Sequence, residues 1–369
     1  MSNSPTKVLL VEDSPVALEI LQRLLTSSPE VKVVGTARNG KEALELIPKV
    51  QPAVICTDLH MKEMDGLEFT KQVMAKDPRP ILVISTSVQK EDTQTIFRLL
   101  EAGAVDVFPK PSTGLSSDYE LVRRELLSKI KILSGVRVFI KQQKPLTTIT
   151  NGTQRSSGGS ALPQAQSALQ PPTAGRIINI TSSIRMVTIG ASTGGPQALH
   201  TILAQLPANF PVPVVCTQHI SDGFLQGLVG WLASESQLQV KIAQVGELPL
   251  PGAVYFAPER SHLELDAKGR FIYSMSPLVD GHRPSVTVTF KSVANFYGRA
   301  TAGVLLTGMG RDGAEGMQAI AQAGGLTIAQ DEKSSVVFGM PKEAIALGAA
   351  QHILPPQEIA PLLLTKIFS

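Results

Sequence analysis

The sequence has few cysteines, little net charge and no long apolar run, and each shortage excludes a class of protein. Cys56 and Cys216 each stand inside an apolar segment typical of a buried strand, which favours two core residues in a reducing compartment over a disulfide. A net charge of +3 over 369 residues, without zinc-ligand spacing or a basic helix, gives no reason to expect nucleic-acid binding. No apolar run reaches the roughly 18 residues of a membrane span, and the first residues, MSNSPTKVLLVED, lack the pattern of a signal peptide. We therefore expect a cytoplasmic protein that is not inserted in a membrane.

Residues 5–133 alternate short apolar segments with amphipathic ones. The apolar segments, rich in Val and Ile, are KVLLVED, VKVVGTA, PAVICTD, PILVIST and AVDVFPK. Between them, Leu, Ile and Phe recur at spacings of three and four residues, as they do along one face of a helix. This alternation predicts an α/β domain with a doubly wound parallel sheet covered by helices on both faces.

The apolar pattern then stops and later resumes. Residues 134–183 become rich in Gly, Ser, Thr, Gln and Pro, and such a segment cannot bury enough apolar surface to offset its ordering entropy. Residues 184–369 return to the α/β pattern, with expected strands RMVTIGAS, VPVVCTQH, VKIAQV, AVYFAPE, FIYSMS, AGVLLTGM, LTIAQD and HILP. The sequence therefore predicts two doubly wound α/β domains, 5–133 and 184–369, joined by a flexible linker.

Polar residues stand at the ends of the expected strands of the first domain. Glu12 and Asp13 end the first strand, Asp58 ends the third, and Ser85 and Lys110 follow the fourth and fifth. Ligands of open parallel sheets bind at the carboxyl ends of the strands, where the strand order reverses. Three carboxylates gathered there repel one another and suit Mg²⁺, which prefers oxygen ligands. Lys110 and Ser85 would then bind a phosphoryl group, with Asp58 as the acceptor that forms an acyl phosphate.

Each of these residues alone also has a plain structural explanation; Asp13, for example, could cap a helix before Pro15. The ordered set resembles the receiver domain of response regulators over nearly all of residues 5–133. The resemblance implies a flavodoxin-like fold and phosphorylation of Asp58 by a sensor histidine kinase, with Mg²⁺ as cofactor. The sequence departs from the family at Lys62, where proline is usual, and at Val107, where an aromatic residue coupled to switching is frequent.

A glycine-rich segment, GASTGG at residues 190–195, follows the first expected strand of the second domain and precedes a helical pattern. It could cradle a phosphate, although the GxGxxG fingerprint and the P-loop lysine are missing. It could also be an ordinary tight turn. A third interpretation is a nucleophile elbow, because Gly190 to Gly194 fits GxSxG and would present Ser192 above the sheet. The motif alone does not decide among the three.

Two residues at later strand ends favour the nucleophile. His219 ends the segment VPVVCTQH, and Asp312 follows AGVLLTGM, so both can converge on Ser192. Ser192 would attack a carbonyl, His219 would take and return its proton, and Asp312 would orient the imidazole. The order Ser, His, Asp differs from the Ser, Asp, His of α/β-hydrolases, so that fold is not implied. In the loop LTGMGRDG, the backbone N–H of Met309 is the expected oxyanion donor, a group whose loss typically costs about 10²–10³ in rate.

Other interpretations of these residues stay open. His262 and His282 are rivals of His219 for the role of base, and Asp312 with the glycine after it could form an ordinary turn. The remaining histidines, His60, His200 and His352, are ascribed to ordinary surface or core positions. A non-catalytic signalling adaptor is the alternative from another class, although a pure binding domain has no need of three polar residues at strand ends.

Five segments, in order IGASTGGP, TQHI, HRPSV, LLTGMGRDGAEG and QDEKSSVVFGMPKEAI, resemble the motif set of the chemotaxis protein-glutamate methylesterases, the CheB family. With the receiver in front, the resemblance covers the whole chain apart from the linker. It implies a Rossmann-like catalytic domain that demethylates glutamyl methyl esters on methyl-accepting chemotaxis receptors, releases methanol, and also deamidates glutamines. It implies no metal in this half and places the chain beside membrane receptors without inserting it. A phospho-regulated esterase of another carboxyl ester remains the alternative.

Two departures from the CheB pattern and one coupling hypothesis complete the expectations. The family often has Asp at Thr287 and Pro-Gly at Pro258-Glu259, changes that we expect to affect the cleft rim and substrate fit. We also expect the unphosphorylated receiver to pack over the Ser192 cleft and phosphorylation of Asp58 to favour an open form.

Overall fold

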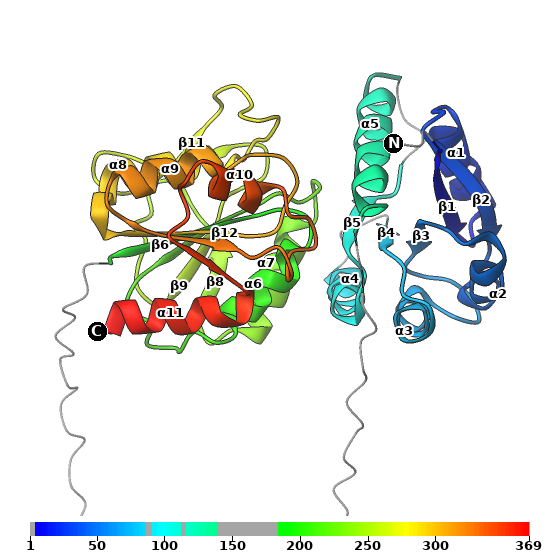
Figure 1. Cartoon of the computed structure of the whole chain (residues 1–369), viewed down its shortest axis with the longest axis horizontal. Helices are drawn as coiled ribbons and strands as arrows, with labels where there is room; N and C mark the ends of the chain where they lie inside the picture. The colour runs from blue at the N-terminus through cyan, green and yellow to red at the C-terminus, as the bar shows by residue number, and fades with distance from the viewer. Residues whose placement is uncertain (1–3, 86–89, 112–115, 137, 139–183, 369) are drawn as a thin grey trace, which may run out of the picture.

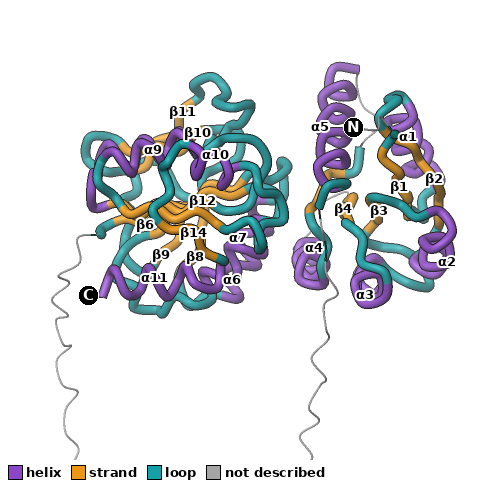
Figure 2. Tube along the Cα trace, viewed as in Figure 1, coloured by secondary structure: helices purple, strands orange, loops and turns teal. Residues whose placement is uncertain are grey.

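The structure is a computed structural model that describes residues 4–85, 90–111, 116–136, 138 and 184–368. The predicted linker, residues 134–183, lies outside the described residues apart from its first few positions. The two described parts each contain a parallel sheet with helices around it (Figures 1 and 2).

The N-terminal sheet has the strand order β2-β1-β3-β4-β5, and all its described pairs are parallel. Its strands are β1 (Thr6–Val11), β2 (Val31–Ala37), β3 (Val54–Asp58), β4 (Ile81–Ser85) and β5 (Asp106–Pro109). Its helices are α1 (Pro15–Thr26), α2 (Gly40–Val50), α3 (Gly66–Lys76), α4 (Lys90–Ala102) and α5 (Ser116–Leu133). This is the flavodoxin-like order, so the predicted fold class is confirmed for this half.

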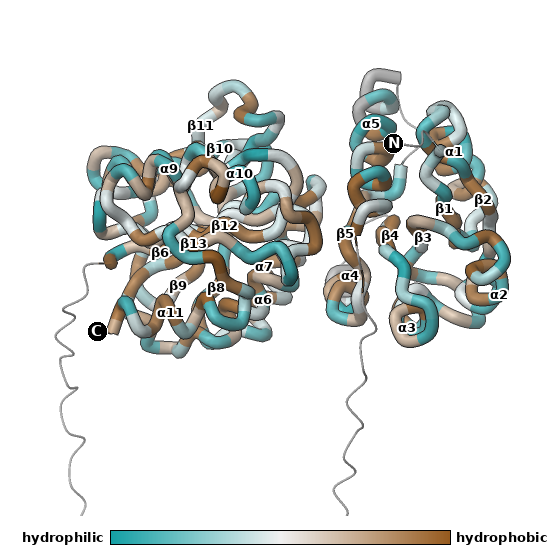
Figure 3. Tube along the Cα trace, viewed as in Figure 1, coloured by the Kyte–Doolittle hydropathy of each residue, from teal (hydrophilic) through white to brown (hydrophobic). Residues whose placement is uncertain are grey.

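The strands of this sheet are continuous runs of apolar residues because helices cover both faces of the sheet. Successive residues of a strand point to opposite faces: Val8 and Leu10 pack with α1 and α5, whereas Leu9 and Val11 pack with α2, α3 and α4. Figure 3 shows hydrophobic residues along strands of this sheet such as β4 and β5. The N-cap of α1 is Ser14, whose hydroxyl accepts from Ala17 N, so Asp13 is not the cap.

The C-terminal sheet has seven parallel strands within the described residues, in the order β14-β13-β12-β6-β7-β9-β8. The strands are β6 (Met186–Ala191), β7 (Val214–Gln218), β8 (Gln239–Ile242), β9 (Ala253–Phe256), β12 (Thr301–Leu305), β13 (Leu326–Gln330) and β14 (His352–Leu354). The helices are α6 (Gly195–Leu203), α7 (Leu225–Glu235), α8 (Val286–Tyr297), α9 (Ala314–Gln322), α10 (Met340–Ala346) and α11 (Pro356–Phe368), with a short 3₁₀ turn, η1 (Gly298–Ala300). The predicted doubly wound arrangement is confirmed here too.

A small antiparallel pair stands apart from this sheet. It joins β10 (His262–Leu265) to β11 (Phe271–Ser274) through a turn closed by Gly269. The sequence interpretation anticipated β11 but not β10, because HLEL is only four residues long and half polar.

The two halves pack through α4, which lies against α6 and α7 (Figure 1). Phe97 of α4 stacks on Trp231 of α7, with ring centroids 5.0 Å apart, and the indole N–H donates to Glu101 over 3.1 Å. The Gln197 amide donates to the carbonyls of Leu100 and Ala104. Among the described helices, none is long and apolar enough to cross a membrane.

Candidate active site

An acidic crevice lies where the strand order of the N-terminal sheet reverses, between β1 and β3. Glu12, Asp13 and Asp58 each offer a carboxylate oxygen, and these oxygens lie within 4.8 Å of one another. Lys110 Nζ reaches in from the end of β5, 2.8 Å from Glu12 and 2.9 Å from Asp58. Ser85 is buried at the end of β4, the strand paired with β3. The five residues expected at this site therefore lie at neighbouring strand ends.

The charges of this crevice are only partly balanced by the protein. Burial raises the pKa of Glu12, and the charge of Asp58 raises it further. Burial opposes the ammonium form of Lys110, but its bonds to Glu12 and Asp58 prevail and raise the pKa of Lys110. One ammonium thus faces three carboxylates. Carboxylate oxygens are the ligands that hard divalent cations prefer, so the three could bind a divalent metal ion.

A second crevice lies at the reversal of the C-terminal sheet, between β6 and β12. Ser192 directly follows β6, and His219 directly follows the neighbouring strand β7. Asp312 is reached by a loop after β12 and stands just before α9. The chain therefore brings all three expected catalytic residues to one edge of the sheet, where ligands of such sheets bind.

Asp312 is almost completely buried, and its carboxylate accepts four hydrogen bonds. The donors are His219 Nε2 at 2.9 Å, Ser285 Oγ at 2.8 Å, Val286 N at 2.8 Å and Thr287 N at 2.9 Å. The last two are backbone groups of the first turn of α8, whose N-terminus favours a negative charge. Although burial alone would raise it, the bond to His219 and these other donors hold the pKa of Asp312 far below its usual range.

The bond to Asp312 fixes the tautomer of His219. Because a carboxylate only accepts, Nε2 of the neutral ring carries the proton and Nδ1 is the bare acceptor. Nδ1 is buried and has no hydrogen-bond partner among the described residues, so Ser192 is not bonded to it. His219 and Asp312 are thus paired, while Ser192 lines the same cleft as His219 without a hydrogen bond to its ring.

The turn that carries Ser192 is held by backbone bonds and by one buried amide. Ser192 N donates to Thr307 O over 3.0 Å, and the Gln218 amide donates to the carbonyls of Ser192 and His219 over 2.8 and 2.7 Å. Gly194 has a φ of +78°, a conformation that glycine adopts without strain. The sequence interpretation missed Gln218, although a buried glutamine at the end of an apolar strand was a signal.

The loop after β12 passes directly against the nucleophile. A Cβ added to Gly308 would stand 2.7 Å from Ser192 Cβ, so only backbone fits at this position. Met309, the next residue, is 45% exposed and lines the same cleft as Ser192. The close approach of this loop to Ser192 fits the expectation that one of its N–H groups faces the reacting carbonyl, which stays a prediction.

The two rival histidines have different positions. His282 lies in the cleft with its ring stacked on that of His219. His262 is completely buried; its Nδ1 accepts from Ser285 N over 3.2 Å and its Nε2 contacts Pro277 O at 3.1 Å. His262 therefore holds Ser285, the residue whose hydroxyl donates to Asp312.

One expectation about the cleft rim was wrong. Thr287 is buried, its backbone N–H donates to Asp312, and its hydroxyl accepts from Gly313 N over 2.7 Å. It belongs to the support of the carboxylate because it lies in the first turn of α8. Glu259, in contrast, does line the cleft and accepts from Gly223 N over 2.7 Å.

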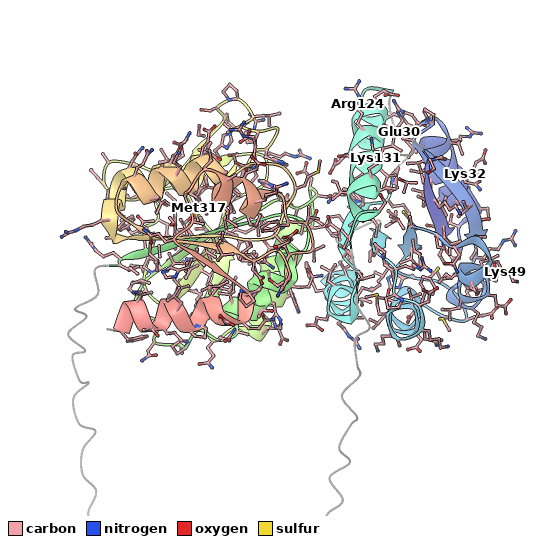
Figure 4. The ribbon with its side chains drawn as sticks, viewed as in Figure 1. Glu30, Lys32, Lys49, Arg124, Lys131 and Met317 are labelled. Carbon is pink, nitrogen blue, oxygen red and sulfur yellow. The ribbon has the colours of Figure 1, made fainter. Side chains whose placement is uncertain are left out.

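The cleft encloses about 450 Å³, and helix α5 of the N-terminal half forms one of its walls. Lys129 of α5 lies 2.6 Å from Asp106, and the same carboxylate oxygen accepts from Thr193 Oγ1, beside Ser192, over 2.9 Å. The far side of α5 is tied to its own half by Lys131, which is 2.7 Å from Glu30; Figure 4 labels both.

Comparisons with known proteins show which family the chain belongs to. The family model of the CheB methylesterase matches residues 187–363, and that of the response regulator receiver domain matches residues 8–116. A protein-glutamate methylesterase/protein-glutamine glutaminase of Nitrosospira multiformis is 40% identical over 96% of this chain and 95% of its own length. Another, from Syntrophus aciditrophicus, is 40% identical over 97% of both chains. The crystal structure of the Thermotoga maritima CheB methylesterase catalytic domain is 42% identical and covers 49% of this chain and 98% of its own, with a TM-score of 0.49. The chain belongs to the CheB family of protein-glutamate methylesterases/protein-glutamine glutaminases.

Proposed function

We propose that this chain hydrolyses glutamyl methyl esters of methyl-accepting chemotaxis receptors in the cytoplasm, releases methanol, and deamidates glutamines at such positions. The observation that carries the proposal is the buried Asp312–His219 pair beside Ser192 at the switch point of the sheet. Relatives that span nearly the whole chain are named for the same two activities. In this proposal residues 5–133 form the receiver, 184–369 the catalytic domain and 134–183 the tether.

The proposed reaction proceeds through an acyl-enzyme. Ser192 Oγ attacks the ester carbonyl while His219 Nδ1 takes its proton, and the imidazolium is stabilised by Asp312. The carbonyl oxygen becomes an oxyanion that accepts from the Met309 N–H. Collapse breaks the bond to the methoxy oxygen, which leaves as methanol with the proton from His219. A water, deprotonated by the same Nδ1, then releases the glutamate and restores Ser192. An amide substrate follows the same path and loses ammonia.

The bare Nδ1 of His219 supports this assignment. His219 and Ser192 line the same cleft, and Nδ1 has no competing donor among the described residues, so it is free to accept from the serine hydroxyl. Catalytic hydrogen bonds are often long before substrate binds.

The regulatory part of the proposal concerns the acidic crevice. Asp58 accepts the phosphoryl group from a sensor histidine kinase, and Lys110 and Ser85 bind it. Glu12, Asp13 and Asp58 would hold Mg²⁺, which supplies positive charge to the phosphoryl oxygens. Their clustered oxygens and the raised pKa of Glu12 fit such an ion.

Helix α5 supports a covering role for the unphosphorylated receiver. Its Lys129 lines the cleft and pairs with Asp106, which holds Thr193. A phosphoryl group on Asp58 would favour an arrangement in which this wall has moved away.

Methanol release from methylated receptor, measured with and without a small phosphodonor, tests substrate, catalysis and regulation together. We expect slow release that rises on phosphorylation, and none above background with Ser192→Ala. A normal rate for that variant would contradict the assigned nucleophile. Hydrolysis of simple carboxyl esters without methanol release from receptor would favour the alternative function, a phospho-regulated esterase of another carboxyl ester.

A further inference from the structure

His282 lies flat against the proposed base. The rings of His219 and His282 have centroids 3.8 Å apart and planes inclined by 10°, the closest stacked pair of rings in the described part of the chain. Such a separation is van der Waals contact, so the His219 ring cannot tilt toward its neighbour. We propose that His282 is a positioning residue for His219: its neutral ring fixes the plane of the imidazole, and its π face stabilises the imidazolium formed when His219 takes the serine proton. The inference rests on the proposed role of His219 as base.

A tight turn holds His282 in place. Val279 and His282 exchange two backbone hydrogen bonds, of 2.9 and 3.2 Å, around Asp280 and Gly281. The φ values of +50° and +83° at these two central residues are those of a type I′ turn, which suits an Asp-Gly pair. The next residue, Arg283, anchors the turn by donating to the carbonyls of Met275 and Ser276 over 3.1 and 3.3 Å. The wall behind His219 is therefore a rigid one.

The charges around His282 keep its ring neutral. Burial lowers the pKa of His282 to about 4, and the adjacent His219 acts in the same direction. Asp312, in the loop after β12, opposes this effect, whereas Lys129 of α5 reinforces it. Two face-to-face imidazolium ions would repel each other, so His282 stays neutral when His219 takes the serine proton.

Asp312 and His282 would thus act on different parts of the same ring. Asp312 binds its edge through Nε2, and His282 covers one face. A cation over an aromatic face gains about 0.5–2 kcal/mol, and the gain appears only once the proton has moved to His219. Its loss should therefore lower kcat about 2- to 30-fold, at roughly 1.4 kcal/mol for each factor of ten, and leave KM nearly unchanged.

The test uses the full chain with Mg²⁺, a small phosphodonor and methylated receptor. His282→Phe keeps a neutral ring in the stack, whereas His282→Ala removes it. We expect His282→Ala to lose about 2- to 30-fold in kcat and His282→Phe to recover most of that loss. The acid limb of the pH profile should have the same midpoint in His282→Phe and in the unaltered chain, because the ring acts without titrating. Thermal unfolding identifies any variant that does not fold.

Three outcomes would overturn the inference: a normal kcat for His282→Ala, a His282→Phe variant as slow as His282→Ala, or a displaced acid limb in His282→Phe. The last two would mean that His282 acts through a ring nitrogen. His219→Ala and Ser192→Ala are the parallel controls. Activity in either would contradict the proposed triad itself, a result distinct from failure of the stacking role.

Discussion

Both sheets of this chain reverse their strand order beside a buried carboxylate, yet the two carboxylate sites are stabilised differently. In the N-terminal crevice, Glu12, Asp13 and Asp58 face one ammonium, that of Lys110. In the C-terminal crevice, Asp312 accepts from a histidine, a hydroxyl and two backbone N–H groups of a helix. The first arrangement leaves negative charge that an external cation can balance, as suits a switch. In the second, the protein's own groups supply every donor described above, as suits the carboxylate of the proposed triad, which must stay ionised in every cycle.

The largest expected effect comes from neutralising the C-terminal carboxylate. Asp312→Asn keeps the size of the side chain but cannot hold His219 in the required tautomer or stabilise its charged form. We expect methanol release to fall on the order of 10⁴-fold. Asp266→Asn, in an exposed turn of the same half, is the matched control and should stay within about twofold, since surface changes cost little. A loss of less than about tenfold for Asp312→Asn would mean that Asp312 only supports the fold.

Removing divalent metal separates the two crevices. With EDTA present, we expect the phosphodonor to stop accelerating methanol release, because the three carboxylates would then repel the incoming phosphoryl group. The unstimulated rate should be unchanged, since Asp312 draws its stabilisation from protein donors. Parallel assays with excess Mg²⁺ restored serve as the control. A fall in the unstimulated rate that Mg²⁺ reverses would contradict the difference between the two crevices, because the C-terminal crevice would then depend on metal as well.

The smallest expected effect comes from removing one of the hydrogen-bond donors to Asp312, the hydroxyl of Ser285. Ser285 caps α8 by accepting from Val288 N and also donates to Asp312. Ser285→Ala should lower the free energy of unfolding of the catalytic half by about 2 kcal/mol, from a lost cap and a lost bond to a charged group. Urea denaturation measures this change. Ser234→Ala, an exposed serine bonded only to its own helix, is the control. Equal effects of the two substitutions would show that Asp312 does not depend on Ser285.

The ends of the strands could be predicted from the sequence because apolar runs mark the strands. These ends carry four of the site residues to the two crevices: Glu12, Asp58, Ser192 and His219. The hydrogen bonds that support Asp312 could not be predicted from the sequence. They depend on the first turn of α8 packing against a loop more than twenty residues later in the chain. For the same reason Thr287 was assigned to the rim although it lies beneath the carboxylate. Gln218 and His262 were missed as structural supports because their partners are carbonyls and N–H groups that no side-chain motif records.

The aromatic contact between the halves gives this chain its own optical reporter. Trp231 is the only tryptophan of the sequence, 7% exposed, and it lies against Phe97 of the receiver with its indole N–H on Glu101. Withdrawal of α4 would hydrate the indole and move its fluorescence emission to longer wavelength. The same protein can therefore be followed by emission and by methanol release, without any attached dye.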